Sequence, residues 1–124
     1  MYHKDLEVYK KSIELVKNIY EVTAKFPSSE QFGLVMQLRR AVVSIPSNIA
    51  EGNARNSDKE TSRFVDIALG SLAEVDTQLL IAKELNFVTN EIYEQLLEQL
   101  RYVQALLIGL KSYFQNKEKS KGIT

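Results

Sequence analysis

The sequence predicts an all-α protein, and within that class an antiparallel four-helix bundle with up-down-up-down topology. Apolar residues recur at steps of three and four through most of the 124 residues, the spacing that places side chains on one helix face. Proline, capping residues and polar runs divide this pattern into four segments. Each segment is long enough for a helix of about 30 to 40 Å, and short connections favour antiparallel neighbours. No stretch shows the period-two alternation that predicts a strand.

The first segment predicts a helix over residues 4–25. It contains two neighbouring apolar stripes, one formed by Leu6, Tyr9, Ile13, Val16 and Tyr20 and the other by Val8, Leu15, Ile19 and Val22. The opposite side is charged and includes a Glu21–Lys25 pair at a spacing of four, which supports a helix. Phe26-Pro27 ends the segment, because the residue before a proline is driven out of the helical region.

The second segment contains a proline within an otherwise helical pattern. A capping box over Ser28, Ser29, Glu30 and Gln31 is expected to begin this helix. Its predicted inward stripe comprises Leu34, Leu38, Ala41, Val42, Ile45 and Ile49. Pro46 falls on this pattern, where it removes one backbone hydrogen bond and clashes with the preceding turn. We therefore expect the helix to be kinked near Pro46 or to restart there.

The third helix has the clearest start signal, a capping box over Ser57, Asp58, Lys59 and Glu60. Its predicted inward residues are Phe64, Ile67, Ala68, Leu72, Val75 and Leu79, and it ends near Asn86. Thr89 is expected to cap the fourth helix, whose predicted core stripe is Ile92, Leu96, Leu100, Val103, Leu107, Leu110 and Phe114. We expect one four-helix domain over residues 1–115 and a disordered polar tail over residues 116–124, which lacks an apolar period.

Composition excludes several classes of function. The absence of cysteine excludes disulfides, thiolate metal sites and a cysteine nucleophile, and the single histidine, His3, excludes a histidine metal cluster within one chain. We therefore expect neither a metal nor a cofactor. The chain has no apolar run near the roughly 18 residues that span a bilayer and no signal-like segment at its start. A cytoplasmic protein that does not enter membranes is expected.

Polar residues around the proline raise the question of catalysis. Ser44, Ser47, Asn48 and Glu51 are grouped, and such residues can support nucleophilic chemistry. However, neither a histidine nor a lysine lies nearby in the sequence to act as a base, and capping around Pro46 explains the same residues. We predict that the protein is not an enzyme.

Charge is unevenly distributed although the formal net charge is zero. Between residues 39 and 63 the basic residues are Arg39, Arg40, Arg55, Lys59 and Arg63, against the acidic Glu51, Asp58 and Glu60. Between residues 74 and 98 only Lys83 opposes six acidic residues. Arginine suits phosphate because its planar fork binds two oxygens. Two interpretations stay open: these five residues bind phosphates of RNA or DNA, or they solvate the surface and pair with neighbouring carboxylates.

The helices have more apolar residues than a single core requires. Tyr102, Leu106, Gly109 and Tyr113 form a line displaced from the core stripe of the last helix, and Gly70 and Ala73 permit close approach on the third. One interpretation is a wide core stripe with scattered surface residues. The other, which we favour, is burial against a second subunit, because contiguous exposed apolar patches mark interaction surfaces.

Three stretches resemble one bacterial family of four-helix proteins. They are LEVYKKSIELVKNIY from Leu6, FPSSEQFGLVMQLRRAVVSIPSNIAEGNARNSDKE from Phe26, and FVDIALGSLAEVDTQLLIA from Phe64. Together they look like the 23S rRNA intervening-sequence proteins, over about Leu6 to Tyr113, with QLRR, SIPSNIAEG and S-x-K-E as the specific block. The chain is also similar to the accessory variability-determinant proteins of diversity-generating retroelements.

This resemblance implies a homopentamer that binds nucleic acid through basic surface residues. It also implies that the shared motif is mainly structural and shapes the second helix and a subunit contact, through Pro46, Ser47, Asn48, Glu51 and Gly52. The resulting hypothesis is a non-enzymatic oligomeric bundle that binds structured RNA or DNA. The alternative is a protein-interaction scaffold that binds a protein partner and no nucleic acid.

Overall fold

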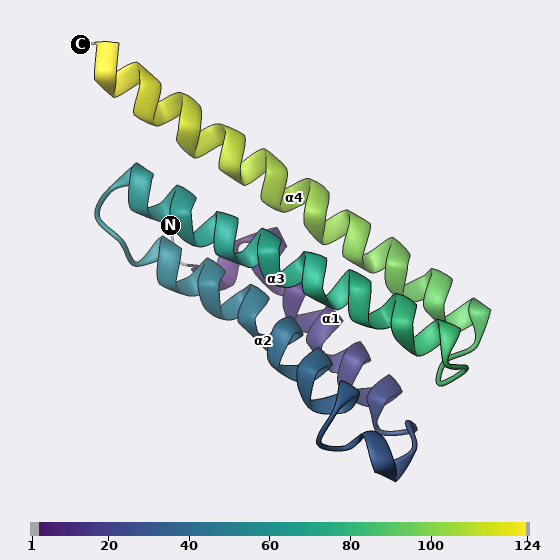
Figure 1. Cartoon of the computed structure of the whole chain (residues 1–124). Helices are drawn as coiled ribbons and strands as arrows, with labels where there is room; N and C mark the ends of the chain where they lie inside the picture. Colours follow the sequence, from purple (N-terminus) through teal and green to yellow (C-terminus); the bar gives the residue numbers. More distant parts are fainter. Residues whose placement is uncertain (1–2, 124) are drawn as a thin grey trace.

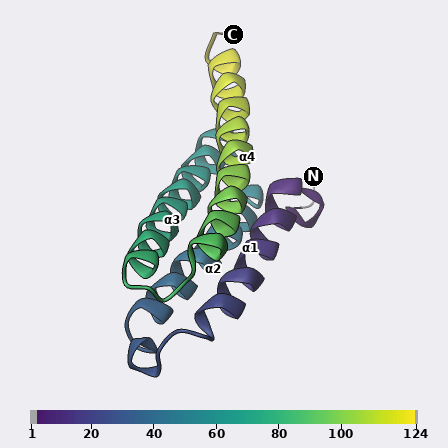
Figure 2. The ribbon, with the colours of Figure 1, turned by 90° about the vertical axis from the view of Figure 1, so that its right-hand side faces the viewer.

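Four α-helices make up the fold in the computed structural model, which describes residues 3–123 (Figures 1 and 2). They are α1 (Glu7–Thr23), α2 (Leu34–Asn53), α3 (Asp58–Glu84) and α4 (Asn90–Ile123), with short 3₁₀ helices η1 (His3–Asp5) and η2 (Ser28–Glu30) before α1 and α2. Residues 3–123 contain no strand, so the predicted all-α four-helix class is confirmed.

Each helix packs against two others. The packed pairs are α1 with α2, α2 with α3, α3 with α4 and α4 with α1, while the two diagonal pairs of helices make no close backbone contact. Consecutive helices run in opposite directions along the bundle (Figure 1). The last turns of α4 extend beyond the connection between α2 and α3 in both views (Figures 1 and 2).

The core follows the predicted stripe most closely in α2, where all six expected residues are buried. In α1 the stripe of Val8, Leu15 and Ile19 lines the core together with two polar residues, Ser12 and Thr23. These hydroxyls can be buried because each donates to a carbonyl of its own helix, Ser12 to Tyr9 and Thr23 to Ile19, both at 2.7 Å.

The predicted core stripe of α3 is partly wrong. Ile67 is 41% exposed and Phe64 is only half-buried, whereas Val65 is 1% exposed and lies in the core. The face of α3 that points into the core therefore differs from the predicted one. Its inward positions include the polar residues Thr61, Ser71 and Gln78, which apolar periodicity does not detect. Ala68, Leu72, Val75 and Leu79 are buried as expected.

The predicted start of α2 is also wrong, because Ser28 does not cap it. Residues 28–30 form η2, and α2 begins only at Leu34, six positions after Ser28. The Glu30 carboxylate accepts from the Leu34 N–H at 3.4 Å, so an acidic side chain compensates the positive end of this helix.

The starts of α3 and α4 agree with the sequence. The Ser57 hydroxyl accepts from the Glu60 N–H, and the Thr89 hydroxyl accepts from the Ile92 N–H, both at 3.1 Å. These bonds satisfy backbone donors that have no partner inside the helix.

The end of α4 differs from the predicted boundary at residue 115. The helix continues to Ile123 through a stretch that was expected to be a disordered tail, and Thr124 lies outside the described residues. The stretch adds lysines and a glutamate, which have good helix propensity, to a helix already fixed by packing.

Pro46 lies inside α2 without dividing it. The helix is continuous from Leu34 to Asn53, so the expected alternative of a restart is wrong, and the kink stays a prediction. Side chains around the proline bond to backbone carbonyls: Ser47 Oγ donates to Val43 O at 2.9 Å, and Asn48 Nδ2 donates to Ser44 O at 2.8 Å.

Candidate nucleic-acid interface

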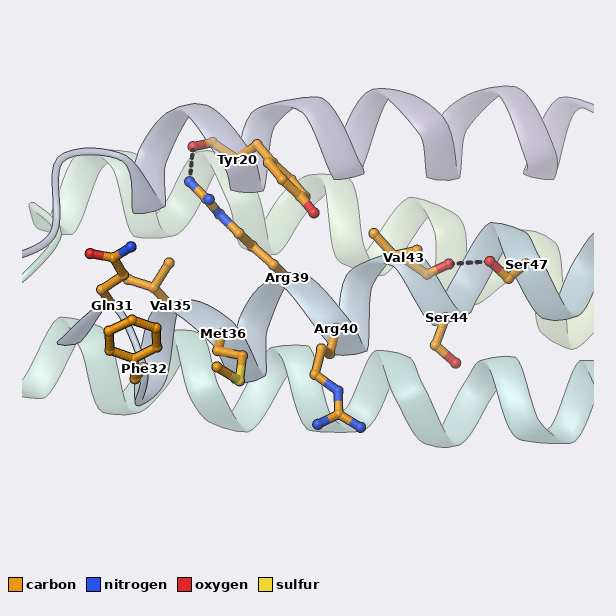
Figure 3. A pocket seen from close by; sticks show the side chains of 10 residues that line it. All are labelled: Tyr20, Gln31, Phe32, Val35, Met36, Arg39, Arg40, Val43, Ser44 and Ser47. Atoms are coloured by element: carbon orange, nitrogen blue, oxygen red, sulfur yellow. Dashed lines mark hydrogen bonds between the residues drawn. The ribbon is translucent and has the colours of Figure 1, made fainter.

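Arg39, the first of the five predicted phosphate-binding residues, is engaged inside the protein. Its Nε donates to Thr23 Oγ1 at 3.0 Å and its Nη2 donates to Tyr20 O at 3.2 Å (Figure 3). The guanidinium carbon lies 4.4 Å from the centroid of the Tyr20 ring. Because the last carbonyls of a helix are partly negative, this cation caps the end of α1 and joins it to α2.

Arg40 lies on a different side of α2 from Arg39. Its side chain points away from α1, toward α3 (Figure 3), and has no partner among the described residues. Fifteen positions separate it from Arg55, a distance of about 22 Å at the rise of an α-helix. Arg40 is therefore far from Arg55.

The remaining three predicted residues lie together where α3 begins. Arg55 forms an ion pair with Glu51 at 3.4 Å, and its guanidinium carbon lies 4.8 Å from the centroid of the Phe64 ring. Lys59 and Arg63 follow one turn apart on α3, and both are exposed and without a partner in the described part of the chain. Two unpaired cations thus lie beside a third that is 43% exposed.

The second half of α4 adds lysines to the same end of the bundle. Its antiparallel packing places Lys111 Nζ 2.7 Å from Asp66 Oδ1 and Lys117 Nζ 3.7 Å from Asp58 Oδ1, both on α3. Lys119 lies beyond them and is exposed. Lysines 117, 119 and 121 fall in the last turns of α4, which ends at Ile123.

Charge is therefore polarised along the bundle. The half formed by residues 3–12, 46–66 and 106–123 has ten lysines and arginines against seven acidic residues. The other half has six basic and nine acidic residues. We call the first half the basic end. The formal net charge of the chain does not show this positive excess, because the negative excess of the other half cancels it.

The predicted structural motif fixes the contact between α2 and α3. The Thr61 hydroxyl donates to the Gly52 carbonyl at 2.9 Å. A Cβ at Gly52 would lie 2.9 Å from the Phe64 Cβ and 3.3 Å from the Thr61 carbonyl oxygen, so only glycine permits this approach. Of the other motif residues, Pro46 is buried, Ser47 and Asn48 bond to α2 carbonyls, and Glu51 pairs with Arg55.

A second surface lies along α2 and α3, away from the basic end. It includes a polar groove of about 290 Å³ that contains Arg40, Ser44, Ser71, Glu74 and Gln78. The hydroxyls of Ser44 and Ser71 are 2.8 Å apart, whereas the buried Oε1 of Gln78 has no hydrogen-bond partner. Beside the polar groove lies a shallow groove that shares Gln37, Glu74 and Gln78 with the first and is also lined by the open Gly70 and the exposed Ile81. We call this surface the α2–α3 face.

A third feature is a shallow groove of about 560 Å³ between α1 and α2 (Figure 3). Its lining includes Tyr20, Met36 and Phe32, whose side chain is 81% exposed. Arg39 and Arg40 lie along the same groove. An exposed phenylalanine beside arginines is typical of surfaces that contact proteins.

Neither a metal centre nor a membrane span is found in residues 3–123. The described side chains include no group of three histidine, cysteine, aspartate or glutamate residues placed to hold an ion. None of the described helices combines the length and the apolar character needed to cross a bilayer.

Sequence reasoning missed several residues of the basic end. Phe64 was assigned to the core by period alone, Thr61 received no role, and Tyr113 was assigned to a subunit contact. The ion pairs of Lys111 and Lys117 could not be predicted, because only the antiparallel packing of α4 on α3 places these lysines beside Asp66 and Asp58. Their signal in the sequence was the cluster of lysines near the end of the chain.

The chain was compared with known proteins at the levels of sequence and structure. The comparison with curated proteins found no match. Among solved structures, the chain is similar to a protein of unknown function from the S23 ribosomal protein family of Bacteroides thetaiotaomicron VPI-5482. The TM-score is 0.80 at 24% identity, over 90% of this chain and 99% of that one, which shows a shared fold. The model of the 23S rRNA-intervening sequence protein family matches residues 4–109. The chain belongs to the 23S rRNA-intervening sequence protein family.

Proposed function

We propose that this protein is a non-enzymatic oligomer that binds structured RNA or DNA through its basic end. The observation that supports this most is the pair of exposed, unpartnered cations Lys59 and Arg63 beside Arg55. Backbone phosphates are bound by such side chains without any need for sequence-specific contacts. Arg39 is removed from the proposed contact set because two of its N–H groups donate to α1 and its guanidinium lies over the Tyr20 ring.

Two matched variants test this site. Lys59→Ala with Arg63→Ala removes the unpaired cations of the basic end, whereas Arg101→Ala removes an exposed cation in the other half of the bundle. Fluorescence anisotropy with a labelled RNA hairpin should show weaker binding for the first variant and unchanged binding for the second. Equal losses would indicate attraction to charge in general, and no loss in the double variant would contradict the site.

We further propose that copies of the chain associate through the α2–α3 face. Association would cover the exposed Ile81 and could supply the missing partner of Gln78 Oε1. Arg40 and Glu74 line one groove as charges of opposite sign without an ion pair to each other, which favours pairing across two copies. The family resemblance suggests five subunits.

Glycine variants test the contact without disturbing the monomer. Gly70 on the α2–α3 face and Gly109 on α4 both have open space where a Cβ would lie. Gly70→Arg should yield a monomer in light scattering because it places bulk and charge on the contact. Gly109→Arg lies on the apolar line of α4 that the sequence also favoured as a subunit contact, and it should keep the wild-type mass if the α2–α3 face forms the contact. A monomeric wild type would refute the association, and an unaltered mass for Gly70→Arg would refute the assigned face.

A protein-interaction scaffold without nucleic-acid binding is the second candidate. The groove between α1 and α2 favours it, because Phe32 is 81% exposed there. Such a scaffold would form the same oligomer and fail to bind the RNA hairpin at low salt. The anisotropy experiment therefore separates the two candidates.

A further inference from the structure

The basic end contains a cavity that the phosphate contacts alone do not require. It measures about 330 Å³ and lies between the end of α2, the start of α3 and the second half of α4. Its lining includes Arg55, Asp58, Tyr113, Phe114 and Lys117. A volume of this order is at the lower end of the range for small-molecule pockets.

Aromatic and cationic side chains both line this cavity. Tyr113 is 58% exposed and stands edge-on to Phe114, with ring centroids 5.1 Å apart. Lys117 Nζ lies 5.8 Å from the Tyr113 centroid, and Arg55 lies over the Phe64 ring nearby. An exposed ring beside a cation can stack a nucleobase while the cation contacts the adjoining phosphate.

The lining of the cavity also includes polar side chains among its apolar ones. The Asp58 side chain is only 10% exposed and lies 3.7 Å from Lys117 Nζ, and the Asn53 amide is also part of the lining. Carboxylate and amide groups are the ones that recognise the hydrogen-bonding edge of a base. The cavity thus combines a stacking ring, two cations and polar groups that face one space.

We propose that this cavity binds one unpaired nucleotide of an RNA or DNA strand. The base stacks on Tyr113 with its edge toward Asp58 and Asn53, and Lys117 and Arg55 contact its phosphates. Lys59 and Arg63 hold the phosphates of the flanking strand. This inference rests on the proposed nucleic-acid binding and deepens it, because only a base outside a duplex exposes its face to a ring.

Two substitutions at one position separate stacking from charge. Tyr113→Leu keeps an apolar side chain but removes the ring, whereas Tyr113→Phe keeps the ring as the matched control. Anisotropy is measured with a labelled oligouridylate and with an RNA duplex of equal length. Tyr113→Leu should bind the single strand at least about fivefold more weakly, since one stacked base contributes about 1 kcal/mol or more. Duplex binding and the Tyr113→Phe variant should stay unchanged.

An abasic strand provides a second readout that does not depend on the fold of the variant. The wild type should lose affinity when the bases are removed from the strand, and Tyr113→Leu should bind the strands with and without bases equally. Equal wild-type affinity for both strands would overturn the proposal. Equal wild-type affinity for single strand and duplex, with no effect of Tyr113→Leu, would overturn it while leaving the proposed function intact. Absence of binding to any strand at low salt would refute the proposed function itself.

Discussion

At the scale of single residues, replacing Gly52 and replacing Gly109 by alanine should have opposite effects on stability. Gly52→Ala should destabilise the fold by about 1–3 kcal/mol, because its Cβ would press on Phe64 at 2.9 Å and on the Thr61 carbonyl at 3.3 Å. Gly109→Ala, with open space around the new Cβ, should stabilise it by up to about 1 kcal/mol. Urea unfolding followed by circular dichroism measures the free energy of unfolding of both variants. An equal loss of unfolding free energy in the two variants would contradict the steric account.

A residue-scale prediction on pH concerns Tyr102, whose hydroxyl donates to the Glu7 carboxylate and joins α4 to the start of α1. That hydrogen bond, then burial and then the carboxylate charge raise the pKa of Tyr102 above the usual tyrosine value. A raised pKa means that the stabilisation is fully present below the unfolded pKa of about 10 and is lost as pH rises through the folded pKa.

The direction of this pH dependence can be checked by comparing the wild type with Tyr102→Phe. The difference in unfolding free energy between wild type and variant should be constant from about pH 7 to 9 and should shrink above about pH 10. Urea titrations at fixed ionic strength measure it. A difference that grows as the pH rises would contradict the assigned hydrogen bond.

At the scale of elements, Arg39 shows how one side chain fixes two helices. Replacing it with methionine keeps most of the apolar stem but removes the donors to Tyr20 O and Thr23 Oγ1. The variant should lose about 1–3 kcal/mol of unfolding free energy, the range for bonds from a charged donor. RNA binding measured by anisotropy should not change, and a large loss of affinity would return Arg39 to the phosphate-contact set.

Elements also show what the sequence could predict. The stripe of α2 and the caps at Ser57 and Thr89 were predictable because they depend on spacing and on local hydrogen bonds. The rotation of α3 was not, because Thr61 is buried by a bond to Gly52 in another helix. The start of α2 was missed because Glu30, one turn ahead of Leu34, replaced the serine cap.

The candidate site was less predictable than the fold. Arg55, Lys59 and Arg63 are close in sequence and lie together, but Arg39 and Arg40, though adjacent in the chain, diverge to opposite sides of α2 (Figure 3). Whether a cation is free depends on carboxylates and carbonyls brought near by tertiary packing. The hydrogen-bond partners of Arg39 lie on α1, sixteen and nineteen positions earlier in the sequence.

At the scale of the whole molecule, antiparallel packing turns local charge differences into a polarised bundle. The basic residues of α3 and α4, except Lys83 and Arg101, come to one end, and the six acidic residues between positions 74 and 98 lie in the other half. A neutral protein can thus present a positive surface at one end. Repetition of this end around an oligomer would add the contacts of several subunits.

The salt dependence of RNA binding tests the central claim most directly. Each phosphate contact releases counterions, so the logarithm of affinity should fall linearly with the logarithm of salt concentration. Removing Lys59 and Arg63 should reduce the magnitude of that slope by about two per subunit in contact with RNA, whereas Arg101→Ala should leave it unchanged. An affinity that does not change between low and physiological salt, or equal slopes for all three proteins, would contradict phosphate binding at the basic end.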